Sequence, residues 1–229
     1  MQSSLKTSGL LLIAIPVAVG LGVASTGGSP GGYSSAPGQS NCTSCHGSFP
    51  LDSGSNDLLL GVPATKVGLA SVPIQVSFAS SSAFKHGFEL SARDVFDLKV
   101  GTLQITDATN TKLVSNDVTQ TTAGAGKSTW STAWMPSGVT PAGPLKFYAC
   151  GLEGNGGGTS GDHVYTAVAT VYQAEISTPA STWPLGATQT LTLKAPTRPG
   201  DDYIVAMSDG ASPTTLPGDG SSEAISVSV

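Results

Sequence analysis

Two cysteines and a histidine lie within five consecutive residues of this sequence, in the stretch NCTSCHG. Their order, Cys42, Cys45 and His46, is the Cys-x-x-Cys-His pattern through which c-type haem is attached. On one short helical turn, cysteines three residues apart bring both sulfurs to positions where two haem vinyl groups can form thioethers. The following imidazole can then bind the iron. The sequence therefore predicts one covalently bound haem c.

Other roles for these three side chains have less support in the sequence. The chain has only three cysteines and three histidines, so chance seldom produces the pattern. A Cys42–Cys45 disulfide beside an incidental histidine is compatible with an oxidising compartment. A thioredoxin-like pair needs a βαβ context, and a zinc site needs more sulfur or imidazole ligands. The third cysteine, Cys150, lies in an apolar segment and is interpreted as a small buried hydrophobic residue.

The sixth iron ligand has few candidates. Met135 ranks first because it ends an apolar segment just before Pro136, and His86 ranks second. Met207 and His163 follow, and an open iron position comes last. If the strands between them run simply up and down, Met135 and His86 fall at the same end of the fold. A methionine ligand predicts a higher reduction potential than a second imidazole.

The composition favours an exported all-β protein. Charged residues make up 11% of the chain and the net charge is -5, so the chain offers no basic surface for nucleic acid. Hydrophobic residues make up 39%, mostly separated by Ser, Thr, Gly and Pro rather than arranged at helical spacing.

The N-terminus predicts export. Lys6 precedes an apolar run from Leu10 to Ala24 that is interrupted by Pro16 and followed by small residues. Residues 1–25 are therefore expected to be a cleaved signal peptide or an uncleaved membrane anchor, with a slight preference for the anchor. Residues 26–40, rich in Gly, Ser and Pro, are expected to form a flexible linker.

Short alternating apolar segments cut by Gly, Pro, Asn and Asp predict a sandwich of about seven antiparallel strands, which with the attachment segment spans 41–176. The expected strands are 72–78, 87–92, 100–106, 112–115, 128–134, 145–150 and 163–172. A boundary near Ser177 separates a small C-terminal β subdomain, 177–229, that is expected to pack on the sandwich. The Gly-rich stretch 153–162 is interpreted as a hairpin connection. A calcium loop through Asn155 and Asp162 is the less favoured alternative.

Four segments, in order, resemble a known family: GQSNCTSCHG, HGFELSARD, STWSTAWMPSG and GPLKFYACGLEGNGGGTSGDHVYT. They are similar to the exported choice-of-anchor V domain proteins, whose sandwich is Reeler-like, and the resemblance covers roughly residues 33–172. The resemblance implies an exported β-sandwich with a haem-attachment sequence at its N-terminal edge. Family members often have Ala where Met135 stands and His near Gln120. The chain ends in EAISVSV without a hydrophobic tail, which leaves the N-terminal segment as the candidate anchor.

These features predict an electron carrier rather than an enzyme. The expected role is a monohaem cytochrome c on the periplasmic or outer face of a membrane. It would pass single electrons from a donor to a membrane-embedded complex of photosynthesis or respiration. Two hypotheses of other classes stand beside it: a surface-binding or adhesion module whose haem is structural or absent, and a haem sensor or peroxidase with an open iron position.

Overall fold

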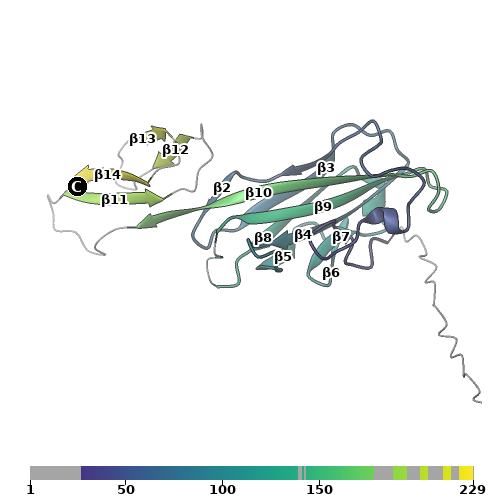
Figure 1. Cartoon of the computed structure of the whole chain (residues 1–229), viewed down its shortest axis with the longest axis horizontal. Helices are drawn as coiled ribbons and strands as arrows, with labels where there is room; N and C mark the ends of the chain where they lie inside the picture. Colours follow the sequence, from purple (N-terminus) through teal and green to yellow (C-terminus); the bar gives the residue numbers. More distant parts are fainter. Residues whose placement is uncertain are drawn as a thin grey trace, which may run out of the picture.

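The structure is a computed structural model that describes residues 27–138, 141, 143–177, 188–194, 202–205, 214–217 and 222–228. It confirms the all-β prediction: within these ranges, the helical elements are two three-residue 3-10 turns, η1 (Cys42–Ser44) and η2 (Gly124–Gly126). Two sheets face one another in the sandwich (Figure 1).

The smaller sheet has four antiparallel strands, in the spatial order β1 (Leu58–Gly61), β3 (Val72–Phe78), β8 (Thr129–Met135) and β5 (Thr102–Ile105). The larger sheet runs in the order β6 (Thr111–Val114), β7 (Asp117–Gln120), β4 (Lys85–Arg93), β9 (Leu145–Gly154), β10 (His163–Ser177), β11 (Thr188–Lys194) and β14 (Ser222–Ser228). Outside this path, β2 (Thr65–Val67) pairs in parallel with β10, and β12 (Asp202–Val205) pairs with β13 (Thr214–Pro217).

The core lies between the two sheets, where alternate residues of each strand meet. In β3 the apolar residues Val72, Ile74 and Val76 are buried and the residues between them are more exposed, which is the period-two pattern of a strand with one solvated face. Trp130 and Trp134 of β8 fill the centre. Their indole N–H groups donate to the carbonyl oxygens of Gly124 and Val100, so neither polar atom is buried without a partner.

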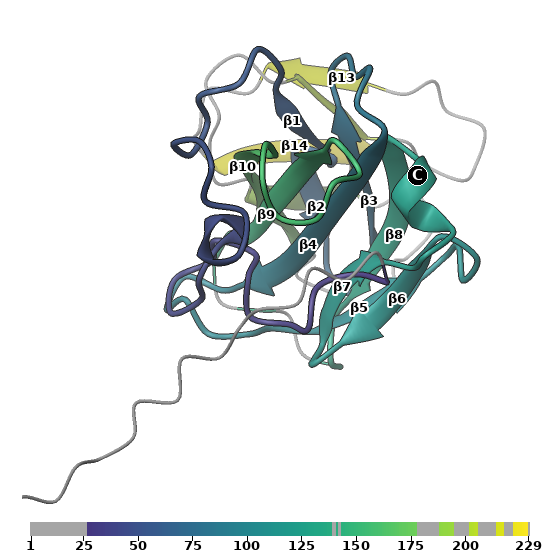
Figure 2. The same cartoon turned by 90° about the vertical axis from the view of Figure 1, so that its right-hand side faces the viewer.

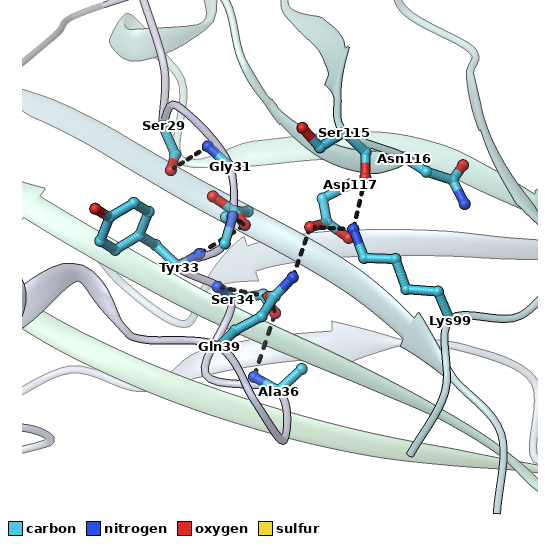
Figure 3. A network of polar contacts seen from close by, with 12 residues as sticks. Ser29, Gly31, Tyr33, Ser34, Ala36, Gln39, Lys99, Ser115, Asn116 and Asp117 are labelled. Carbon is cyan, nitrogen blue, oxygen red and sulfur yellow. Dashed lines mark hydrogen bonds and ion pairs between the residues drawn. The ribbon is translucent and has the colours of Figure 1, made fainter. Parts of the chain in front are cut away.

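The segment 27–40 differs from the expected flexible linker, because it packs against β4 and β7 (Figure 2). The fully buried Glu89 carboxylate accepts hydrogen bonds from the backbone N–H groups of Gly32 and Tyr33, at 2.7 and 2.8 Å. The Gln39 side chain donates to Asp117 at 2.8 Å (Figure 3). Two buried carboxylates on the sheet therefore hold the segment in place.

The predicted leader, residues 1–25, lies outside the described residues. In the ranges that the structure does describe, no helix has the length and hydrophobicity to cross a membrane.

The C-terminal strands join the sandwich through strand pairing. β10 ends at Ser177, the predicted boundary, and its last three residues pair with Thr192, Leu193 and Lys194 of β11. Figure 1 shows these strands beyond the end of β10 that is farthest from η1.

Candidate functional site

The Cys-x-x-Cys-His residues form an ordered turn. The Asn41 side chain accepts a hydrogen bond from the Thr43 N–H at 2.9 Å and caps the start of η1. The backbone N–H groups of Cys45 and His46 both donate to the carbonyl oxygen of Cys42. Because residues three apart are nearly eclipsed in a 3-10 turn, Cys42 and Cys45 lie on the same side.

This turn borders a groove on the outer face of the larger sheet. The groove is shallow: its cavity volume is about 90 Å³, below the roughly 300–1,000 Å³ of a typical ligand pocket, so a cofactor-sized molecule would fill it only with one edge or face. Its walls come from the N-terminal segment, η1, β4, β9 and the end of β7, and they consist of Gly28, Ser29, Pro30, Tyr33, Cys42, Cys45, His46, Gly87, Phe88, Gln120 and Leu152. A second hollow adjoins it and shares His46, Gly87, Gln120 and Leu152, and the candidate ligand His86 also borders this second hollow.

The floor of the groove is open because β4 has a glycine there. Gly87 pairs in register with Leu152 of β9, so the two positions share one face of the sheet. A Cβ atom at Gly87 would stand 2.9 Å from Gln120 Nε2, so the Gln120 side chain would have to shift. A larger residue at position 87 would therefore narrow the groove.

His46 is held by a buried carboxylate. Its Nδ1 lies 2.6 Å from Asp162 Oδ2, and the two side chains are 13% and 1% exposed. An ionised carboxylate can only accept, so the proton of a neutral His46 ring sits on Nδ1 and the lone pair on Nε2. A histidine that donates from one nitrogen to a carboxylate and offers the other is the usual arrangement of a metal-binding imidazole.

The Gly-rich loop is built to position Asp162. Asp162 Oδ1 accepts from the Asn155 N–H at 3.0 Å, and the Asn155 side chain bonds within the loop to Gly157 N and Ser160 O. Ser48, just after His46, accepts from the Gly161 N–H at 2.8 Å. The predicted hairpin connection therefore also joins the attachment segment to β10. Because His46 occupies Asp162 Oδ2, the structure does not favour the calcium alternative.

Cys150 lies beside Cys42. Its side chain is fully buried on β9, and its Sγ accepts a hydrogen bond from the Cys42 N–H at 3.2 Å. Hydrogen bonding between the two thiols, followed by burial and by the nearby Glu89 carboxylate, raises the pKa of Cys42 well above its ordinary value. The interpretation of Cys150 as a buried residue is confirmed, but its contact with Cys42 was not predicted from the sequence.

The structure does not bring Met135 to this site. Met135 ends β8 in the smaller sheet and pairs with Thr102. Trp130, five residues earlier on the same strand, packs against Phe88 beside the groove. At about 3.3 Å per residue, Met135 lies roughly 17 Å further along β8. The expectation that Met135 and His86 share one end of the sandwich is therefore wrong, because β8 runs away from the groove.

The rings of His86 and His163 make their contacts outside the groove that Cys42, Cys45 and His46 border. His86 lies next to Gly87, but its ring packs against Phe78 in the core, and its Nε2 lies 2.5 Å from Ser81 Oγ. Burial lowers the pKa of His86, and the Glu153 carboxylate opposes that effect. His163, the first residue of β10, stacks on Phe49 with ring centroids 4.2 Å apart.

Of the remaining predicted residues, Met207 lies outside the described residues. Sequence analysis missed Asp162 as the partner of His46, and Tyr33 as a wall of the groove. The sequence shows that Asp162 immediately precedes an expected strand, but no neighbouring residue indicates that it pairs with His46, 116 positions away. Within the described ranges, no three His, Cys, Asp or Glu side chains gather as a metal-binding group.

Comparison with known proteins adds a structural likeness. No protein-family model matches the chain, and no curated protein matches it. Among solved structures, the chain is similar to the Reelin-N domain of F-spondin, with 19% identity and a TM-score of 0.41, over 57% of this chain and 96% of that chain. The fold and the site themselves define the class: a β-sandwich with an ordered Cys-x-x-Cys-His turn over an apolar groove.

Proposed function

We propose that the chain is a monohaem c-type cytochrome built on a Reeler-like sandwich of the choice-of-anchor V kind. One observation carries the proposal: Cys42, Cys45 and His46 border a single groove, and Asp162 fixes the orientation of the imidazole. The groove is lined largely by apolar and small groups, as a porphyrin face requires.

Each residue has a defined part in this proposal. Cys42 and Cys45 would hold the haem through thioethers, and His46 Nε2 would bind its iron. Asp162 keeps the proton on His46 Nδ1 and makes the ring a stronger donor. A bound haem would supply a one-electron Fe(III)/Fe(II) couple. Leu152 supplies an apolar side chain to the groove wall, whereas the Phe88 ring packs into the core against Trp130.

A second candidate function follows from the groove wall. Among the described residues that line it, His46 is the sole methionine or histidine. If haem is bound and no second side chain binds its iron, the chain would be a haem protein that binds a small ligand, as a sensor or peroxidase does. Met207 remains a candidate ligand for the electron-carrier form.

The proposed location is the periplasmic or outer face of a membrane, with residues 1–25 as the signal or anchor. The groove is lined in part by Gly28, Ser29 and Pro30. If the leader stays in the membrane, the short stretch between the leader and these residues would keep the groove near the membrane surface. The proposed partners are an electron donor and a membrane-embedded complex of photosynthesis or respiration, reached at short range. An adhesion module is the remaining alternative if the chain carries no haem.

Optical spectra of the purified full chain test the proposal. A carrier gives a six-coordinate low-spin spectrum with reversible reduction. High-spin iron that binds carbon monoxide readily supports the ligand-binding candidate instead. A chain without a haem spectrum, expressed where haem attachment operates, would refute both.

A further inference from the structure

The contact between Cys42 and Cys150 is a feature that haem attachment does not require. The two residues are 108 positions apart, yet the Cys42 N–H donates to Cys150 Sγ at 3.2 Å. Thioether formation at Cys42 and Cys45 uses neither Cys150 nor its position on β9.

Both cysteines stand on backbone that is fixed by other contacts. Cys150 lies in the centre of β9, paired with Glu89 of β4 on one side and Thr166 of β10 on the other. Cys42 begins η1, which Asn41 caps, and the preceding segment is held by Gly32 and Tyr33 bonding to Glu89. The close approach of Cys150 Sγ to the backbone of Cys42 is therefore a property of the folded chain.

We propose that Cys42 and Cys150 form a disulfide in chains that have not received haem. Cys42 thus has two mutually exclusive covalent states, a thioether to haem or a disulfide to Cys150. The thioether rests on the proposed function, and the disulfide does not. In the disulfide step both thiols lose their protons, and two electrons pass to the disulfide of an exported thiol oxidase, which becomes a dithiol. A dithiol reductant reverses the step and frees Cys42 for haem.

Cys150, rather than Cys45, is the expected partner of Cys42. Cys150 Sγ contacts Cys42 directly, because it accepts the hydrogen bond from the Cys42 N–H at 3.2 Å. A Cys42–Cys150 bond would also fasten the groove wall to β9 and close a long loop, the kind of cross-link that most restricts the unfolded chain.

Peptide mapping tests the disulfide. The full chain is exported to an oxidising compartment in cells that lack haem-attachment machinery, alkylated without reduction and digested with trypsin. Cys42 and Cys45 fall in the peptide that ends at Lys66, and Cys150 falls in the peptide from Phe147 to Lys194. We expect these two peptides to be joined, with one alkylated cysteine, and reduction to separate them.

Two variants assign the bond. Cys45→Ser should keep the joined peptides, and Cys150→Ser should lose them completely. A bond between Cys42 and Cys45, three alkylated cysteines, or loss of the link in Cys45→Ser would overturn the proposal. In cells with attachment machinery, haem-carrying chains should show alkylated Cys150, and a cross-link in those chains would overturn exclusivity. Because the first experiment contains no haem, its outcome is independent of whether the chain is a cytochrome.

Discussion

At the scale of single residues, the character of His46 depends on Asp162. The carboxylate is 1% exposed and lies 2.6 Å from Nδ1, so water screens the interaction little. A negative group at this position increases the basicity of Nε2 and favours the more positively charged oxidised iron. The proposed cytochrome should therefore have a lower reduction potential than one whose histidine donates to a neutral acceptor.

Replacing the carboxylate tests this effect. Asp162→Asn removes the charge and keeps the shape, so we expect a higher midpoint potential in a spectroscopic redox titration. Asp57→Asn, at an exposed position, is the matched control and should leave the potential unchanged. An unchanged or lowered potential in Asp162→Asn would contradict the role given to Asp162.

The position of Met135 gives a second residue-scale prediction. Because Met135 stands about 17 Å along β8 from the groove wall, Met135→Ala should leave the optical spectrum of the haem protein unchanged. Loss of a thioether-to-iron charge-transfer band in this variant would show that the methionine does reach the iron.

Local patterns were predictable from sequence and long-range contacts were not. Cys42, Cys45 and His46 were recognised because one turn contains all three. Asp162 and Cys150 are separated from their partners by 116 and 108 residues, and only the pairing of β4, β9 and β10 brings them together. Met135 was misplaced for the same reason, because the direction of β8 depends on sheet topology.

At the scale of elements, the N-terminal segment acts as one wall of the groove. Its hydrogen bonds end on Glu89 and Asp117, which are both fully buried on the sheet. Lys99 donates to the same Asp117 oxygen at 2.8 Å, so the carboxylate joins the segment to the β4–β5 connection (Figure 3).

Removing the Asp117 carboxylate should loosen the N-terminal segment that forms one wall of the groove. Asp117→Ala removes the acceptor of the Gln39 amide and leaves the Lys99 ammonium with only the Ser115 carbonyl oxygen, so we expect the free energy of unfolding to fall by about 1–3 kcal/mol. Residues 27–40 should become sensitive to limited proteolysis. The exposed Asp57→Ala serves as control. Equal protease resistance in both variants would contradict the account of this segment.

Glu89 gives a pH prediction. Burial, with the nearby Asp117 as a smaller cause, raises the pKa of Glu89 above its ordinary 4.5. Its contribution to stability is therefore complete below pH 4.5 and is lost as the pH rises through the raised folded-state pKa. Glu89→Gln abolishes this loss, so the free energy of unfolding of the variant relative to wild type should increase between pH 4 and pH 8. Urea unfolding at both pH values measures the difference, and a constant difference would refute the prediction.

The strands were predictable from sequence where apolar and polar residues alternate along them. β3 and β8 carry regular apolar positions and were expected from sequence. β7, with the sequence DVTQ, was missed because Val118 is its single apolar residue. The omission mattered for the site, since Asp117 and Gln120 of β7 hold the N-terminal segment and line the groove.

At the scale of the whole molecule, the two ends of the sandwich differ. The groove, η1 and the start of the described chain lie together at one end, and the C-terminal strands extend from the other (Figure 1). An anchor before residue 27 would hold the groove close to the membrane surface. This geometry suits the proposed short-range exchange with a membrane-embedded partner.

The most direct test of the account is the intact mass of the purified full chain, produced where haem attachment operates. We predict the polypeptide mass plus one haem, and loss of that addition in a Cys42→Ala/Cys45→Ala double variant. A wild-type chain at its bare polypeptide mass would contradict the central claim.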